Sequence, residues 1–127
     1  MKEIINTQHA PDPVGPYNQS IRAGDTLYIS GQIAIDPETG TLVKDSIEAE
    51  TDQVLRNLGA ILSAAGLDYT HVVKCSVFVT DMEHYGRINA VYAKYFDEAT
   101  APARELVEVR ALPKYVRVEI SAIATFA

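Results

Sequence analysis

Two stretches near the end of the chain decide the fold: Pro102-Ala103-Arg104-Glu105-Leu106-Val107-Glu108-Val109 and Val116-Arg117-Val118-Glu119-Ile120-Ser121. Both alternate polar and apolar residues, and neighbouring side chains of a β-strand point to opposite faces. The pattern therefore predicts two strands, each with one apolar face and one face that carries charges. The residues assigned to the charged faces are Arg104, Leu106 and Glu108 in the first strand and Arg117, Glu119 and Ser121 in the second.

A third segment, residues 26–35, alternates in the same way and predicts another strand. Its more polar face carries Tyr28, Ser30, Gln32 and Ala34, opposite Leu27, Ile29, Gly31, Ile33 and Ile35. If the three strands belong to one sheet, Ser30, Arg104 and Glu119 project from the same face. An arginine offers a planar fork of donors for a carboxylate or phosphate, and a glutamate can hold water or accept a proton. We therefore expect a site for a small anion, although charges on an ordinary antiparallel sheet are often only solvated or weakly paired.

The length and composition fit one domain, residues 1–127. A chain of 127 residues is large enough to bury a core without disulfides or a structural metal. The net charge of -6 and the pI near 4.9, with no basic run, argue against general nucleic-acid binding. No apolar run approaches the roughly 18 residues that span a bilayer, and residues 1–6 lack the apolar core of a signal peptide. We therefore expect a cytoplasmic protein without membrane or nucleic-acid partners.

The single cysteine and the three histidines give no sign of a metal site. Cys75 has no partner for an internal disulfide, which agrees with a reducing compartment. Alternation over residues 72–79 places it with Val73, Val77 and Val79 on an apolar face, so we interpret it as a core residue rather than a catalytic thiol. The histidines are far apart without ligand spacing, and no Gly-rich phosphate loop is present. The sequence thus predicts no metal.

The remaining periodicity predicts an α+β fold. In chain order, the expected elements are a strand at 2–5, a Pro-rich loop at 10–17, a strand at 18–22, a hairpin turn at 23–25, a turn at 36–40, a helix at 47–65, a strand at 72–79 and a helix at 82–96. Asp45 with Glu48, and Thr80 with Glu83, resemble capping boxes at the two helix starts. Gly66 suits the end of the first helix.

Two helices can cover only one face of the predicted mixed sheet. The other face combines apolar residues with charges, and such a face suits burial in a subunit interface. Symmetric homo-oligomers are common. We therefore expect a site built on that face to be shared between chains.

A series of short motifs extends along nearly the whole chain. In order they are Gly15-Pro16-Tyr17, Ser30-Gly31-Gln32, Asn57-Leu58 through Ala64-Ala65-Gly66, Val73-Lys74, Asn89-Ala90-Val91-Tyr92, Pro102-Ala103-Arg104, Val107-Glu108-Val109, Leu112-Pro113-Lys114 and Val118-Glu119-Ile120. With these motifs, the chain resembles the Rid family of reactive-intermediate imine deaminases, also called the YjgF-like family, and within it the RidA-like subgroup.

The resemblance implies a chorismate-mutase-like protomer and a homotrimer whose sheets form a central barrel, with clefts between neighbouring subunits. By the same resemblance, Arg104 binds the carboxylate of a small 2-imino or 2-oxo acid, and Glu119 helps to place the attacking water. Tyr17, Ser30 and Gly31 match further substrate-binding positions.

Two residues after Arg104 depart from the family pattern. Many RidA-like members have a small residue and then a cysteine, whereas this chain has Glu105 and Leu106. Leu106 still occupies a pocket position, so contacts to the substrate side chain are expected to differ. Glu105 should point away from Arg104, because neighbours on a strand face opposite sides.

The implied activity is that of a 2-iminobutanoate/2-iminopropanoate deaminase, which converts 2-aminoacrylate or 2-iminobutanoate to a 2-oxo acid and ammonia without a cofactor. A protonated imine is already electrophilic, so the protein need only orient the carboxylate and a water. The alternatives are a noncatalytic or regulatory trimer that binds 2-oxo acids, a ribonuclease or translation inhibitor, and a chaperone. The acidic balance argues against the ribonuclease.

Overall fold

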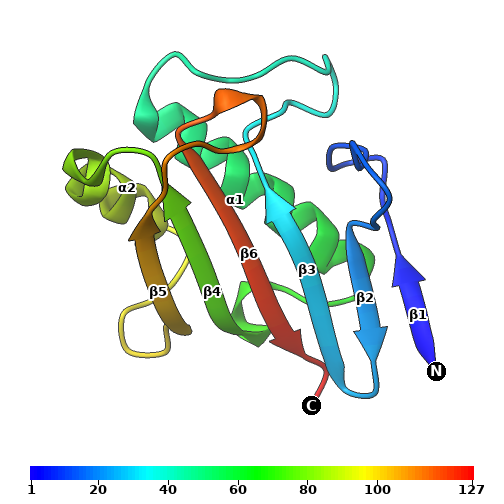
Figure 1. The fold of residues 1–127 in the computed structure, drawn as a ribbon. Helices are drawn as coiled ribbons and strands as arrows, with labels where there is room; N and C mark the ends of the chain where they lie inside the picture. Colours follow the sequence, from blue (N-terminus) through cyan, green and yellow to red (C-terminus); the bar gives the residue numbers. More distant parts are fainter.

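The computed structural model describes residues 1–127, and its framework is one mixed sheet of six strands in the order β1-β2-β3-β6-β4-β5 (Figure 1). The strands are β1 (Lys2–Ile5), β2 (Ser20–Ala23), β3 (Thr26–Gln32), β4 (Val72–Val79), β5 (Ala103–Glu108) and β6 (Val118–Thr125). β4 and β5 are parallel, and every other neighbouring pair is antiparallel. β5 is therefore an edge strand, and β4 separates it from β6.

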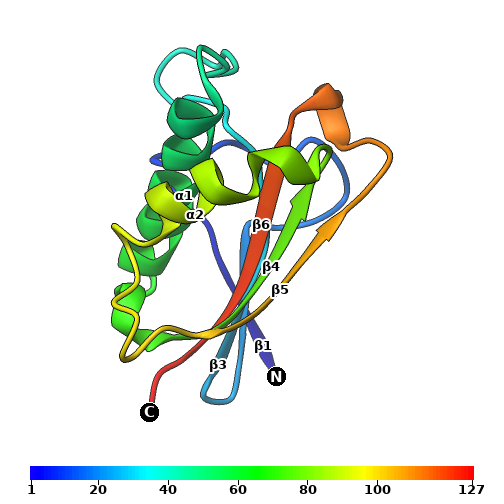
Figure 2. The same cartoon turned by 90° about the vertical axis from the view of Figure 1, so that its left-hand side faces the viewer.

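Two α-helices cover one face of this sheet and leave the other face open (Figure 2). They are α1 (Ile47–Ala64) and α2 (Tyr85–Tyr92), and three short 3-10 turns, η1 (Tyr69–His71), η2 (Met82–His84) and η3 (Pro113–Tyr115), connect the larger elements. The predicted α+β architecture, with two helices on one face of a mixed sheet, is confirmed. None of the helices is both long and apolar enough to cross a membrane.

The start of α1 lies one residue later than its predicted capping box. Ser46 caps the helix, and its side chain accepts a hydrogen bond from the Ala49 backbone N–H at 3.0 Å. The prediction of Asp45 with Glu48 was wrong because Glu48 reaches α2 instead, where its carboxylate accepts two hydrogen bonds from Arg87 at 2.8 and 2.7 Å. The predicted end is confirmed, since Gly66 takes a φ of +79° that favours glycine.

α2 is shorter than the helix predicted over 82–96. Residues 82–84 wind as a 3-10 turn, and its cap is Asp81, which accepts a hydrogen bond from the Glu83 N–H at 2.9 Å, rather than the predicted Thr80. The helix ends at Tyr92, and the chain then turns. Ile88, Tyr92 and Phe96 are buried, but Tyr85 is 44% exposed, so only part of the apolar side of the predicted helix belongs to the core.

The core lies between the helices and the covered face of the sheet. Its largest fully buried apolar residues are Leu27, Ile47, Leu55, Leu58, Ile61, Leu62, Ile88 and Ile120. Cys75 is also fully buried, which confirms its predicted core position. Val73, predicted beside it, is 45% exposed, because the pairing of β4 with β6 shifts between Val72 and Lys74 and turns Val72 inward.

A β-bulge in β3 breaks the alternation predicted for residues 26–35. Ile29 pairs with Ala122 and Gln32 with Ile120, so Ser30 and Gly31 together oppose one residue of β6. The assignment of Gln32 and Ala34 to the open face was therefore wrong: Gln32 is buried, and so is Ala34 beyond the strand.

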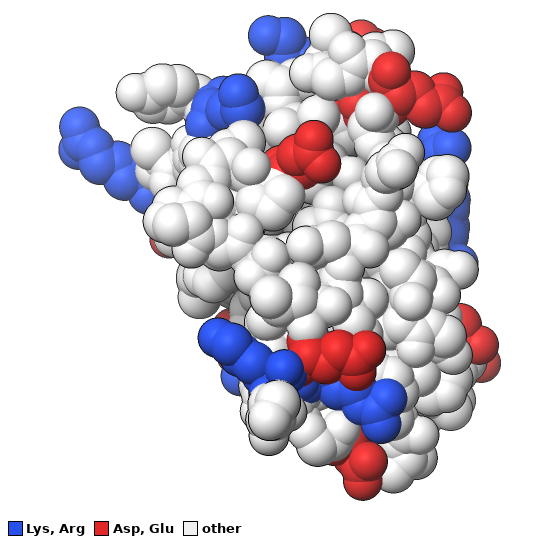
Figure 3. Space-filling view, turned by 90° about the vertical axis from the view of Figure 1, so that its right-hand side faces the viewer, with Lys and Arg blue, Asp and Glu red and all other residues white.

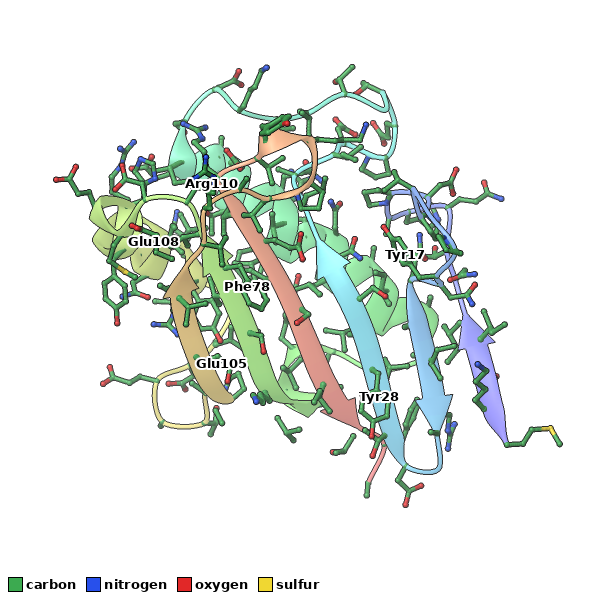
Figure 4. All side chains as sticks on the ribbon, in the orientation of Figure 1. Tyr17, Tyr28, Phe78, Glu105, Glu108 and Arg110 are labelled. Carbon is green, nitrogen blue, oxygen red and sulfur yellow. The ribbon has the colours of Figure 1, made fainter.

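The open face carries an apolar row across four strands. Ile4, Ile21, Tyr28 and Ile123 are aligned in register from β1 to β6. Tyr28 is 50% exposed. Figure 4 labels Tyr28 on β3 and Phe78 on β4. No part of this chain covers these residues.

Candidate active site

Arg104 lies on β5 and points toward the helices. In the parallel pairing with β4, Arg104 stands beside Cys75, whose side chain is buried on the covered face. The prediction that Arg104 shares a face with Glu119 was wrong. Glu119 pairs with Phe78, and these residues alternate with the buried ones, so both belong to the open face.

Three residues of α2 hold the Arg104 guanidinium. Its Nη1 donates to the Asn89 side-chain oxygen at 2.8 Å, and its Nη2 donates to the Tyr85 hydroxyl at 3.4 Å. The guanidinium carbon also lies 4.8 Å from the centroid of the Tyr92 ring, a cation–π contact. All three partners are neutral, and Arg104 forms no ion pair with any carboxylate of the chain. The remaining N–H groups are therefore available to an external anion.

Two ionisable groups lie near Arg104, the Cys75 thiol and the Tyr92 hydroxyl. Burial raises the pKa of the Cys75 thiol and also raises the pKa of the Tyr92 hydroxyl. Both groups therefore stay protonated at neutral pH. Cys75 is not an activated nucleophile, because the thiolate is the reactive form.

Glu119 lies on the open face of β6, directly over Gly31. A Cβ atom added at Gly31 would stand 2.8 Å from Cδ and 3.1 Å from Cγ of Glu119, so the missing side chain makes room for this carboxylate. Burial raises the pKa of the Glu119 carboxyl above its ordinary value of 4.5, with no hydrogen bond to offset it. The carboxylate is therefore a stronger base than an exposed one.

Tyr17 and Ser30 are linked to this carboxylate through Gly31, which it overlies: Ser30 precedes Gly31 in the chain, and Tyr17 lines the same hollow as Gly31. The Ser30 hydroxyl donates to the Asn18 carbonyl at 2.7 Å, which ties β3 to the loop before β2. The Tyr17 hydroxyl accepts a hydrogen bond from the Val14 N–H at 3.3 Å, and Tyr17 and Gly31 line the same small hollow of about 30 Å³. Tyr17, Ser30, Gly31 and Glu119 thus form one group, which we call the glutamate half-site.

Arg104 and Leu106 form a second group, the arginine half-site. Leu106 stands beside Val77 and is partly buried against the core. β4 lies between this half-site and β6, and the two half-sites use opposite faces of the sheet. Figure 4 shows Tyr17 near β2 and Glu105 on β5, toward opposite edges of the sheet. One chain therefore does not bring all the predicted residues together.

Glu105 points away from Arg104, as predicted. Its carboxylate accepts a hydrogen bond from the Ser76 hydroxyl and lies 3.1 Å from the Lys74 ammonium. It therefore leaves the guanidinium of its neighbour free.

The sequence analysis missed the residues that hold Arg104. Tyr85, Asn89 and Tyr92 recur at spacings of four and three, which places them on one face of a helix. The signal was the polar Asn89 within an otherwise apolar stripe. No group of three or more His, Cys, Asp or Glu side chains converges to hold a metal ion.

Comparisons with known proteins match nearly the whole chain. The profile of the family described as Endoribonuclease L-PSP matches residues 7–126. A RutC family protein of Pyrococcus horikoshii is 53% identical over 124 residues, which cover 98% of each chain. The Mus musculus protein named 2-iminobutanoate/2-iminopropanoate deaminase is 45% identical, over 98% of this chain and 91% of its own length. The structure is also similar to that of E. coli TdcF with bound serine, with a TM-score of 0.92 at 41% identity over 98% of this chain and 99% of the other.

Proposed function

This chain belongs to the Rid family, and we propose that it hydrolyses small 2-imino acids to 2-oxo acids and ammonia. The substrates in this proposal are 2-iminobutanoate and 2-iminopropanoate, the imine form of 2-aminoacrylate. The name of the mouse relative supports this substrate class. The bound serine of TdcF, which carries a carboxylate beside an amine, is consistent with it.

The observation that carries the proposal is the unpaired, partly buried guanidinium of Arg104. Neutral partners on α2 fix its orientation without neutralising its charge. A planar guanidinium binds a carboxylate through two parallel hydrogen bonds. We assign Arg104 to binding of the substrate carboxylate. The imine carbon is bonded to that carboxylate, so its position relative to the guanidinium is then fixed.

Glu119 supplies the base in this mechanism. It accepts a proton from water as the oxygen attacks the carbon of the protonated imine, and the C=N π electrons move to nitrogen. The product is a carbinolamine. Protonated Glu119 then gives its proton to the amine nitrogen, and the C–N bond breaks as the hydroxyl oxygen forms the carbonyl. The hydroxyl proton passes to Glu119 and from there to the departing ammonia, which restores the carboxylate. Ammonia and the 2-oxo acid leave, and no oxidant or cofactor is consumed.

A complete site in this proposal requires two chains. Because the half-sites lie on opposite faces of the sheet, we propose a homotrimer in which the arginine half-site of one copy meets the glutamate half-site of the next. The uncovered apolar row of Ile4, Ile21, Tyr28 and Ile123 supports burial of the open face between copies. Cyclic assembly uses this head-to-tail contact in every interface.

Leu106 sets the side-chain preference in this proposal. It follows Arg104 by two residues on the same face of β5, so it stands beside the anchored carboxylate. An aliphatic wall favours an apolar substrate side chain, because a polar one would lose hydrogen bonds with water there. We expect 2-iminobutanoate to react faster than the imine derived from a hydroxylated amino acid.

The test is release of ammonia and 2-oxo acid from imines generated in place by a pyridoxal-phosphate dehydratase. The protein should accelerate release over the spontaneous rate, and Arg104→Ala should lower kcat/KM by about a hundredfold or more. Arg56→Ala is the matched control, because that arginine is exposed on α1. Absence of acceleration, with 2-oxo acid binding retained, would instead favour the noncatalytic binding protein.

The family description also names an endoribonuclease. On the side of the molecule in Figure 3, basic residues form separate groups among acidic ones, without a continuous basic stripe. Binding to a phosphate backbone needs such clustered charge. We therefore favour the small-molecule reaction, and salt-sensitive RNA cleavage that survives Arg104→Ala would contradict this choice.

A further inference from the structure

A cavity of about 330 Å³ lies beside the η3 turn, outside both half-sites. Its walls come from residues 42–44, from Glu50 of α1 and from residues 114–117. The η3 turn and the segment before α1 lie at the same end of the sheet (Figure 1). The volume is within the range of small-molecule sites. None of the residues assigned to deamination lines this cavity.

The cavity gathers basic side chains in a chain with a net charge of -6. Lys44, Lys114 and Arg117 line it, and Glu50 is its single acidic residue. Glu50 is buried and already paired: it accepts hydrogen bonds from Arg117 Nε and from the Arg117 backbone N–H, both at 2.7 Å. Neither lysine forms an ion pair. Two positive charges therefore remain beside the cavity, and they attract an anion.

The rest of the wall is apolar and ends in a strained turn. Leu42, Val43 and Val116 supply aliphatic surface. Lys114 and Tyr115 both have a φ of 56°, in the left-handed region that costs a non-glycine residue about 1 kcal/mol. Tyr115 is 89% exposed and lies at the cavity. Strain that persists where glycine would remove it often marks a ligand site.

We propose that this cavity binds a small organic anion with a flat apolar body, of the class of aromatic carboxylates. Lys44 and Lys114 pair with the anionic group, and the Tyr115 ring covers the apolar body against the aliphatic wall. The site is independent of the proposed deamination, because it shares no residue with either half-site. Inorganic phosphate, which lacks the apolar body, binds more weakly.

The experiment titrates benzoate into the Arg104→Ala protein and follows the backbone amide resonances by NMR. This background removes the proposed carboxylate anchor of the deamination site. We expect saturable shifts at residues 42–44 and 114–117, and a dissociation constant about fivefold higher after Lys44→Ala with Lys114→Gly. Glycine at 114 keeps the left-handed turn. Lys94→Ala, at an exposed position after α2, is the control and should leave the constant unchanged.

Two results would overturn the proposal. One is the absence of shifts in these segments, and the other is a dissociation constant that the double lysine variant leaves unchanged. Equal affinity for benzoate and inorganic phosphate would remove the apolar part of the assignment. Because no turnover is measured, failure of the deamination proposal leaves the outcome of this experiment unaffected.

Discussion

Two inactive variants should restore each other's activity when they assemble together. In the proposed trimer, each cleft takes Arg104 from one copy and Glu119 from the next. An Arg104→Ala chain still supplies Glu119, and a Glu119→Ala chain still supplies Arg104. In a random assembly of equal amounts, each of the two positions of a cleft holds the right chain half of the time. About a quarter of the clefts are then intact.

The assay mixes the two chains in denaturant at a series of ratios, refolds them together and measures 2-oxo acid release. Activity should rise from the level of the single variants, reach a maximum near equal amounts at about a quarter of the wild-type value, and fall again. Different affinity tags on the two chains show that mixed oligomers have formed. Variants refolded separately and then combined are the control, since subunits that have not exchanged cannot complement.

The opposite arrangement gives a different curve. If Arg104 and Glu119 of the same chain served one cleft, every cleft would contain a defect at every ratio. Activity that stays at the level of the single variants, while tagged mixed oligomers are present, would therefore refute the division of the site between chains.

Four further measurements test the residues individually. Gly31→Ala should lower kcat/KM by about tenfold with little loss in Tm, because the new Cβ would displace the Glu119 carboxylate; a normal kcat/KM would contradict the role of this contact. The acidic limb of the kcat/KM profile should lie above pH 4.5, since burial raises the pKa of Glu119 above that value, and the limb should disappear in Glu119→Gln. The raised pKa also means that ionised Glu119 costs stability as the pH rises, so Glu119→Gln should raise Tm more at pH 7 than at pH 4. Glu50→Ala should lower the free energy of unfolding in urea by about 3 kcal/mol, because Arg117 loses its buried partner; a loss below 1 kcal/mol would show that the pair contributes as little as an exposed one.

Sequence patterns predicted the elements whose side chains alternate or repeat regularly. The hairpin at Gly24, with a φ of +62°, and the end of α1 at Gly66 follow from backbone conformations that favour glycine. The two amphipathic helices follow from their apolar stripes. The helix starts do not follow from local sequence in the same way, because Ser46 competes with Asp45 as a cap, and Glu48 can bind either the backbone or Arg87.

The faces of the site strands could not be predicted, for two physical reasons. A bulge reverses the alternation after Ile29, and nothing in local polarity indicates that Ser30 and Gly31 share one partner residue. On β5, both faces carry apolar residues, Leu106 on one and Val107 on the other, so hydropathy does not identify the buried face. Only the register with β4 places Arg104 beside Cys75.

The separation of the half-sites leaves each protomer with two charged groups that have no oppositely charged partner. The Arg104 guanidinium has no carboxylate partner, and the Glu119 carboxylate has lost part of its hydration without gaining a hydrogen bond. A substrate with a carboxylate at one end and a protonated imine at the other matches both charges. The charges that the isolated protomer leaves without partners are therefore those that the proposed cleft needs to select its substrate.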